Sequence, residues 1–153
     1  MLNHTSMKRI SKELDRDFKN FTYNCVIYHP NHRGMEINLT IKSHDLVFKL
    51  TPDYPFKPPG LFVDHIHYID RHKDIYSKNK EQLKKYNSDF GCPCCDTILC
   101  DWSPGNTLHQ LLEEYLIREH KYNKIKHILL FNIVKSQLPF DECVIQTISE
   151  YIQ

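Results

Sequence analysis

Four of the six cysteines in this chain lie in one short segment, at Cys92, Cys94, Cys95 and Cys100. A cysteine thiolate is a good nucleophile, and it is also a preferred ligand of zinc. Zinc sites usually take their cysteines as two separated pairs, with about two to four residues between the members of a pair. The Cys-x-Cys-Cys spacing lacks that form. It therefore favours a nucleophile and keeps a zinc-stabilised scaffold as an alternative.

The elements before this segment must position it, and their pattern is one helix followed by strands. Apolar residues at helical spacing predict a first helix that Thr5 or Ser6 caps. Runs rich in β-branched and aromatic residues predict four strands, at residues 21–28, 35–41, 46–50 and 61–66. Short connections favour antiparallel pairing. The expected fold class is α+β, with a four-stranded antiparallel β-meander.

A proline-rich stretch, residues 51–60, separates the third and fourth predicted strands. Four prolines between Pro52 and Pro59 exclude both a helix and a sheet ladder. We therefore expect a rigid, extended surface track anchored by Tyr54 and Phe56. Residues 67–90 are polar and rich in lysine, which predicts an exposed insertion before the cysteine segment.

Helical spacing of apolar residues returns after Pro104. We expect a helix that Asn106 or Thr107 caps and that runs on through residues 128–134. A last helix is predicted from the spacing of Val144, Ile148 and Ile152.

Composition limits the class of protein further. The chain has 153 residues and a net charge of +1, from 20 Lys and Arg against 19 Asp and Glu, which argues against a globally basic nucleic-acid binder. The length fits a single domain over residues 1–153. No apolar run approaches the roughly 18 residues of a membrane span, and no signal-peptide pattern occurs. We expect an intracellular protein, cytoplasmic or nuclear.

Three motifs occur in a specific order along the chain. They are Lys-Arg-Ile-Ser-Lys-Glu-Leu at residues 8–14, Pro-Asp-Tyr-Pro-Phe-Lys-Pro-Pro at 52–59, and Gly-x-x-Cys-x-Asp at 91–96 followed by Trp-Ser-Pro at 102–104. Together they resemble the first helix, the proline segment and the active-site stretch of the ubiquitin-conjugating enzymes. The resemblance covers roughly residues 7–118, outside the polar insertion. It implies that family's fold, a four-stranded antiparallel meander flanked by an N-terminal helix and C-terminal helices.

The resemblance also implies an activity and a nucleophile. The family accepts ubiquitin or a ubiquitin-like modifier from an activating enzyme as a cysteine thioester, and transfers it to a lysine amine with a ligase. Its nucleophile lies three residues after a glycine, two before an aspartate and eight before the tryptophan. Cys94 meets all three spacings, to Gly91, Asp96 and Trp102, whereas Cys95 meets none. Cys94 is therefore the first choice of nucleophile, with Asp96 beside it, and Cys95 is the second.

Partner surfaces are implied in the same way. Lys8, Arg9 and Lys12 of the first helix would contact the activating enzyme, and Phe56, Ser103 and Pro104 would contact the ligase. From its residue type alone, Phe56 could instead be buried beneath the tryptophan. The resemblance implies no cofactor, because ATP is used upstream by the activating enzyme, and no nucleic-acid or membrane partner.

The chain departs from the family at three places. The family's His-Pro-Asn is missing before the nucleophile, and Asn87 stands in that region, seven residues before Cys94 and eight before Cys95. Residues 67–90 are an insertion, and the part after about residue 120 diverges. A catalytically silent variant that binds ubiquitin or a ligase is therefore the alternative function.

Overall fold

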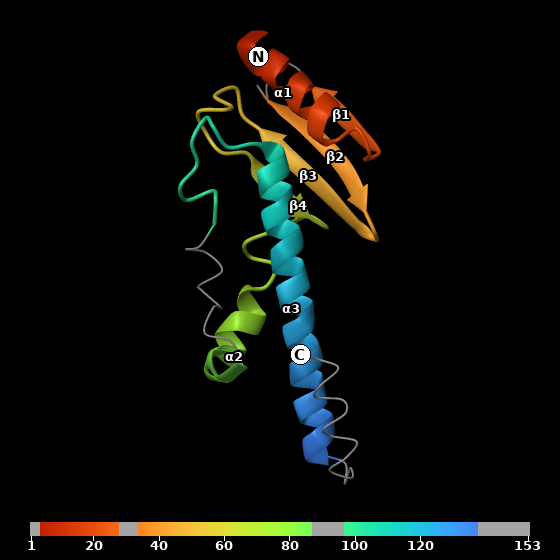
Figure 1. The fold of residues 1–153 in the computed structure, drawn as a ribbon, viewed down its shortest axis with the longest axis vertical. Helices are drawn as coiled ribbons and strands as arrows, with labels where there is room; N and C mark the ends of the chain where they lie inside the picture. The colour runs from red at the N-terminus through yellow and green to blue at the C-terminus, as the bar shows by residue number, and fades with distance from the viewer. Residues whose placement is uncertain (1–3, 28–33, 87–96, 138–153) are drawn as a thin grey trace. The chain divides into compact units, whose positions relative to one another are not determined.

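The computed structural model describes residues 4–27, 34–86 and 97–137. The chain divides into two compact units, residues 1–115 and 116–153. Figure 1 shows the order of elements in the first unit: α1 (His4–Asp17), β1 (Tyr23–Ile27), β2 (Met35–Ile41), β3 (His44–Leu50), β4 (Gly60–Val63), β5 (Ile66–His67) and α2 (Lys73–Tyr86), before α3 begins at Leu108. The α+β class with an N-terminal helix is confirmed.

The strands form one antiparallel sheet in the order β1-β2-β3-β4-β5. Alternation decides its register, since every second residue of a strand faces the same side. In β2, Ile37 and Leu39 are buried and pair with Phe48 and Leu46 of β3; Phe48 in turn pairs with Leu61 of β4. One face of the sheet is thus apolar throughout.

The sheet has five strands, so the expected count of four is wrong. The predicted strand over residues 61–66 ends at Val63, because Asp64 and His65 take left-handed backbone conformations, with φ of 49° and 69°. A strand cannot continue through that geometry. The chain turns there and returns as the two-residue strand β5.

A polar cluster holds this turn. The carboxylate of Asp64 accepts a hydrogen bond from the backbone N–H of Asp45 (3.0 Å) and one from Arg71 (2.8 Å), and it lies 2.7 Å from Nδ1 of His44. The backbone N–H of Asp45 is the main cause that lowers the pKa of Asp64 to about 2, and His44 and Arg71 act in the same direction.

The helix α1 contributes Ile10 and Leu14 to the core, as its spacing predicted. The predicted cap at Thr5 or Ser6 is wrong, because the helix already begins at His4. Ser6 lies inside the first turn, and its buried hydroxyl donates to the carbonyl oxygen of Tyr54 at 2.5 Å.

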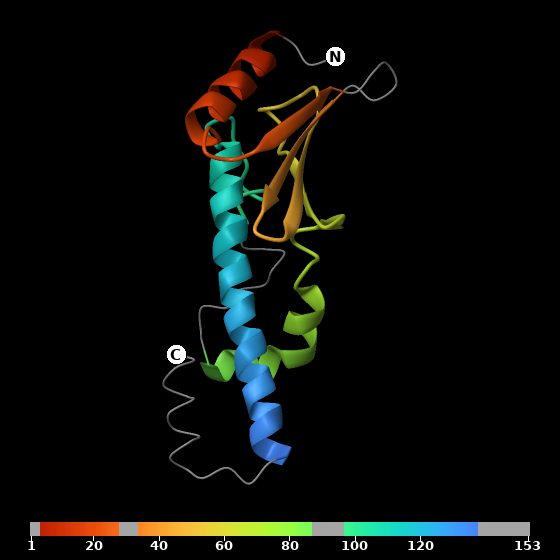
Figure 2. The same cartoon turned by 90° about the vertical axis from the view of Figure 1, so that its right-hand side faces the viewer.

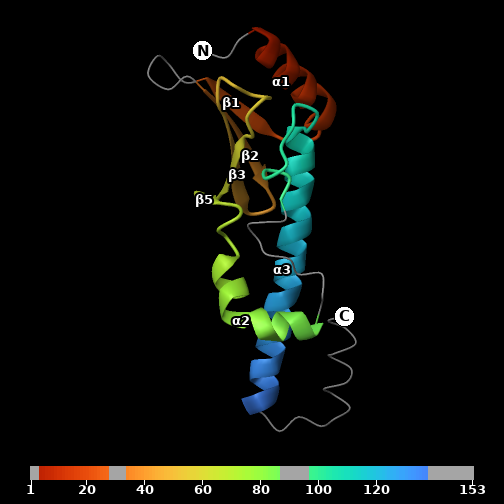
Figure 3. The same cartoon turned by 90° about the vertical axis from the view of Figure 1, so that its left-hand side faces the viewer.

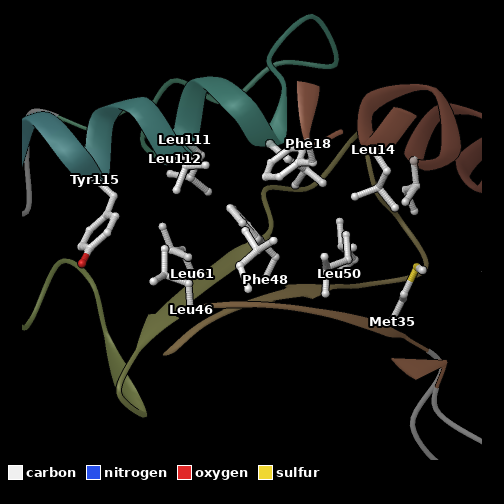
Figure 4. Packing of buried hydrophobic residues seen from close by; sticks show 14 of the residues in the cluster. Leu14, Phe18, Met35, Leu46, Phe48, Leu50, Leu61, Leu111, Leu112 and Tyr115 are labelled. Carbon is white, nitrogen blue, oxygen red and sulfur yellow. The ribbon is translucent and has the colours of Figure 1, made fainter. Parts of the chain in front are cut away.

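The core lies between the apolar face of the sheet and two helical segments. Figure 2 shows α1 and the beginning of α3 on the same side of the sheet. Figure 4 shows the side chains that meet there: Leu14 and Phe18 from the α1 end, Leu111, Leu112 and Tyr115 from α3, and Met35, Leu46, Phe48, Leu50 and Leu61 from the sheet. Phe18 packs edge-on against Phe48, with ring centroids 6.0 Å apart.

The first part of the polar segment, residues 67–72, is less exposed than predicted. It closes the sheet, because the N–H of Tyr68 donates to the carbonyl oxygen of Leu61 (3.0 Å), and both Tyr68 and His72 are buried. Figure 3 shows the chain leaving β5 and entering α2, an element that the sequence pattern indicated only weakly.

The helix α3 spans Leu108–Gln137, which confirms the predicted run through residues 128–134. Of the two predicted caps, Thr107 is confirmed: its Oγ1 accepts from the N–H of Gln110 (3.2 Å), and Oε1 of Gln110 accepts from the N–H of Thr107 (2.9 Å). In the second unit this helix exposes Leu130, Ile133 and Val134.

None of the helices in the described ranges has the length and apolar character needed to cross a membrane. The predicted last helix, with Val144, Ile148 and Ile152, lies outside the described residues.

Candidate functional site

The predicted nucleophile Cys94 and its neighbours Asn87 and Asp96 lie outside the described residues, as do Cys92 and Cys95. Their assignment stays a prediction. The structure does describe the elements on both sides of this segment, α2 before it and the chain from Thr97 after it. The proline-rich stretch, the Trp-Ser-Pro motif and α1 are described as well.

Trp102 joins the proline-rich stretch to the Trp-Ser-Pro motif. Its indole N–H donates to the carbonyl oxygen of Pro55 at 2.8 Å, and its ring packs against that of Tyr54, with centroids 6.2 Å apart. Tyr54 is buried, 1% exposed. Two motifs that are 47 residues apart in the sequence thus form one junction.

The proline-rich stretch is a series of turns rather than an extended track. Tyr54 N–H donates to the carbonyl oxygen of Thr51 (3.1 Å), and Phe56 N–H to that of Asp53 (2.7 Å). These bonds bend the chain so that Tyr54 points inward. The expected anchor at Tyr54 is confirmed, but Phe56 is exposed and does not anchor the stretch to the core. The expectation of an extended conformation is wrong.

Phe56 is 75% exposed, which excludes the alternative that it is buried beneath Trp102. Tyr54, and not Phe56, occupies the space beside the indole. Ser103 and Pro104 are also exposed. Phe56 directly follows Pro55, and Ser103 directly follows Trp102. The hydrogen bond between Trp102 and Pro55 therefore brings together the two backbone segments that carry the predicted ligase contacts.

The turn after Trp102 is held by its own hydrogen bonds. Both the N–H and the hydroxyl of Ser103 donate to Oδ1 of Asn106, at 2.7 and 2.9 Å. Asn106, which the sequence offered as a helix cap, therefore closes this turn, while Thr107 caps α3.

Glu13 is a buried carboxylate that joins α1 to the junction. It accepts hydrogen bonds from the hydroxyl of Tyr54 (2.9 and 3.0 Å), from the backbone N–H of Leu108 (2.9 Å) and from Nε of Arg9 (2.7 Å). Burial raises the pKa of the Tyr54 phenol well above its usual value, and the negative charge of Glu13 adds to this rise. Tyr54 therefore stays a neutral donor at physiological pH.

Arg9 extends the same network to the exposed turn. Its two terminal nitrogens donate to the carbonyl oxygens of Pro104 and Asn106, the latter at 2.6 Å. Sequence reasoning placed Arg9 with Lys8 and Lys12 in a contact with the activating enzyme. Lys8 and Lys12 are exposed on α1. Arg9 instead makes hydrogen bonds within the chain, which fix the turn that carries Pro104. Whether these three residues contact a partner stays a prediction.

Three further polar residues form a hydrogen-bonded group around Thr97, which follows the cysteine segment. They are Tyr68 after β5, Thr97, and Glu114 on α3, and hydrogen bonds link them. Sequence reasoning missed all three, since 29 and 46 residues separate Tyr68 from its two partners. Glu13 could have been identified from the sequence, because this charged residue lies three residues after Ile10 on the apolar face of α1.

The zinc alternative rests on cysteines that are mostly outside the described residues. Of its four ligands only Cys100 is described, and it is exposed. In the described ranges no three His, Cys, Asp or Glu residues come together in a way that could hold a metal ion. Zinc binding by Cys92, Cys94, Cys95 and Cys100 remains a hypothesis.

In comparisons with known proteins, no family model, no curated protein and no solved structure matches this chain.

Proposed function

We propose that this chain is a ubiquitin-conjugating enzyme, which carries ubiquitin or a ubiquitin-like modifier on Cys94 and transfers it to lysine. The order of the elements and the three motifs of the sequence support this function. The single observation that carries it is the junction at Trp102, whose hydrogen bond to Pro55 joins the backbone next to the exposed Phe56 to the backbone that continues into the exposed Ser103 and Pro104.

The junction has the physical properties of a recognition surface. Phe56 offers a large apolar side chain, and the turns of the proline-rich stretch fix its backbone, so binding costs little conformational entropy. Arg9 and Asn106 fix the backbone of Pro104 in the same way. On α1, the exposed Lys8 and Lys12 suit an acidic partner, whose approach they would accelerate.

The chemistry consists of two acyl transfers. In the first, the Cys94 thiolate attacks the carbonyl carbon of the thioester between the modifier and the activating enzyme. A new C–S bond forms, the old one breaks, and the thiolate of the activating enzyme leaves. In the second, a neutral lysine amine attacks the same carbon. A C–N bond forms, the bond to Cys94 breaks, the sulfur leaves as a thiolate, and the nitrogen releases one proton to solvent.

No cofactor takes part in these steps, since ATP acts upstream in forming the first thioester. Asn87 and Asp96 are the residues proposed to act beside Cys94. The acceptor lysine, the activating enzyme and a ligase are the proposed partners. The proposal includes an intracellular location, cytoplasmic or nuclear.

One assay tests this function. The purified chain is incubated with activating enzyme, ubiquitin and ATP, and is run on a non-reducing gel. We expect an adduct that a thiol reductant removes and that Cys94→Ser abolishes, whereas Cys100→Ser retains it. An adduct lost only in Cys95→Ser would move the nucleophile by one residue.

No adduct with any tested modifier would favour the silent, ubiquitin- or ligase-binding variant. Stoichiometric zinc that disappears in Cys92→Ser would favour the scaffold instead. Either result would overturn the enzymatic function.

A further inference from the structure

Three apolar side chains are exposed on one face of α3 near its C-terminal end. Leu130 is 61% exposed, Ile133 is 52% exposed and Val134 is 40% exposed. Residues three and four positions apart on a helix are neighbours on its surface, so these side chains form one patch. Single exposed apolar residues are ordinary, whereas a group of neighbours marks a site of interaction.

Basic side chains continue this face by one helical turn. Lys126 precedes Leu130 by four residues and Ile133 by seven. His127 precedes Leu130 by three residues and Val134 by seven. These spacings place Lys126 and His127 on the same side of the helix as the patch. Both are exposed, and Lys126 forms no ion pair with any residue in the described ranges. The face therefore joins apolar surface to an unneutralised positive charge.

The helical segment from Leu116 to Gln137 is basic as a whole. Its acidic and basic residues are Glu119 against Arg118, Lys121, Lys124, Lys126 and Lys135. Five positive charges and one negative charge give a net charge of +4, whereas the whole chain carries +1. Lys121 and Lys135 are exposed and also lack an ion-pair partner in the part of the chain that the structure describes. Charge concentrated in this way attracts acidic groups and speeds their approach.

The chemistry of this face selects the kind of partner that fits it. The apolar patch requires apolar side chains opposite it, and the lysines require carboxylates. A helix with Leu or Ile at helical spacing, and with Asp or Glu beside them, supplies both. Such a helix can also pack its rows of side chains between those of α3.

Two other occupants suit the face less well. A second copy of this chain would bring a segment of charge +4 against another of +4, which is repulsive. A helix that lies in a membrane surface separates its apolar face from its charged face. In α3, however, Lys126 lies in the same row as Leu130, one turn away. The charges and their spacing therefore favour an acidic protein helix.

We infer that the face formed by Lys126, His127, Leu130, Ile133 and Val134, which we call the basic α3 face, docks an acidic amphipathic helix of another protein. The apolar side chains supply most of the affinity, because they leave water on binding. The positive charge raises the rate of association and makes binding depend on salt. The inference uses neither Cys94 nor thioester chemistry, so it goes beyond the proposed function.

The test uses a synthetic peptide as the probe. It has three heptads, about 21 residues, with Leu at the a and d positions and with Glu at e and g, where like charges keep it from pairing with itself. Fluorescence anisotropy follows its binding to the full chain. We expect saturable binding that weakens by about fivefold or more between about 50 and 300 mM salt, because salt screens exposed charges. The same peptide with Lys at e and g should not bind.

Three variants of the face are compared with two matched controls. Leu130→Ser and Ile133→Ser should each weaken binding by about tenfold or more, because each removes a large apolar contact. Lys126→Glu should weaken binding by about fivefold or more and reduce its dependence on salt. The controls are Ile66→Ser on β5 and Lys19→Glu after α1, which change exposed residues of the same types and should bind like the wild type. Circular dichroism first shows that each variant is folded.

The inference is overturned if the wild type does not bind the peptide, or if the three variants bind it as the wild type does. It is also overturned if binding occurs only in a chain that ends at Gln137. That result would assign the face to this chain's own residues 138–153, which include the acidic Asp141, Glu142 and Glu150.

Two further measurements test the other occupants. A dimer in sedimentation experiments that Leu130→Ser dissociates would assign the face to a second copy and overturn the inference. Binding to phosphatidylserine vesicles that Leu130→Ser abolishes would assign it to a membrane and overturn the inference in the same way. None of these measurements uses ubiquitin or the activating enzyme. Failure of the inference therefore leaves the proposed function standing, and absence of a thioester adduct leaves the inference standing.

Discussion

Replacing Glu13 tests how far one buried carboxylate holds the junction together. This residue is 4% exposed and accepts hydrogen bonds from Arg9, Tyr54 and Leu108, all at 2.7–3.0 Å. Glutamine has nearly the same shape, but it offers one acceptor oxygen instead of two and carries no charge. At least one of the three donors must therefore lose its partner in Glu13→Gln.

The expected loss of stability follows from these contacts. A hydrogen bond to a charged group contributes about 1.5–3 kcal/mol; the one glutamine oxygen can keep two of the three donors, and these two bonds lose the charge of the acceptor. We expect Glu13→Gln to lower the free energy of unfolding by about 2–4 kcal/mol, and Glu13→Ala by about 3–5 kcal/mol, because it leaves all donors unsatisfied. Asp15→Asn is the control: Asp15 lies on the same helix, is exposed, and should change stability by less than about 0.5 kcal/mol.

Urea titration followed by tryptophan fluorescence measures this effect. The chain has one tryptophan, Trp102, and it lies in the junction that Glu13 holds. With a slope of about 1–3 kcal/mol per molar urea, the midpoint for Glu13→Gln should fall by at least about 0.7 M. A double-mutant cycle with Tyr54→Phe should give a coupling of about 1 kcal/mol or more. A midpoint for Glu13→Gln that coincides with that of Asp15→Asn would refute the role of the carboxylate.

Three further perturbations have definite expected results. Asp64→Asn should weaken the fall in the free energy of unfolding at acid pH. The pKa of Asp64 is lowered from 3.8 to about 2, so its contribution to stability is complete above about pH 5 and is lost as the pH falls through 2. Urea titrations from pH 5 to 2 should therefore show the free energies of unfolding of wild type and variant converging. Phe56→Ala should change the free energy of unfolding by less than about 0.5 kcal/mol, because the ring is exposed. Ligase-stimulated transfer of the modifier from the thioester to lysine should fall. Transfer at the wild-type rate would contradict the role of Phe56 as a contact surface. Thr107→Ala should lower the free energy of unfolding, measured by thermal unfolding, by about 1 kcal/mol, because α3 loses its N-terminal cap. A change near zero would show that the Thr107 hydroxyl does not stabilise α3.

Local patterns predicted the sheet well, because burial of one face imposes a period of two residues on each strand. The strands over 35–41 and 44–50 follow that period, and the apolar stripe of α3 follows the helical one. The division of β4 from β5 escaped prediction. Asp64 and His65 adopt positive φ values that neither residue type requires, so only the surrounding contacts select them.

The polar residues that assemble the site were harder to predict. Glu13 could have been noticed, because a charged residue on the buried face of an amphipathic helix needs partners. Those partners, Tyr54 and the N–H of Leu108, depend on how distant segments meet, and no local pattern encodes this. The same holds for Thr97 and Glu114, whose shared partner Tyr68 lies 29 and 46 residues away in the sequence.

The bond between Glu13 and the N–H of Leu108 joins residues 95 positions apart, which has a consequence for synthesis on the ribosome. At about 5–20 residues per second, α1 leaves the exit tunnel roughly 5–19 s before the segment that begins α3. During that interval the acid on its apolar face has no backbone donor from Leu108, and the core between the helices and the sheet lacks the apolar side chains of α3. The N-terminal helix therefore cannot complete its native contacts until the start of α3 has been synthesised, and chaperones that bind apolar segments have time to reach it.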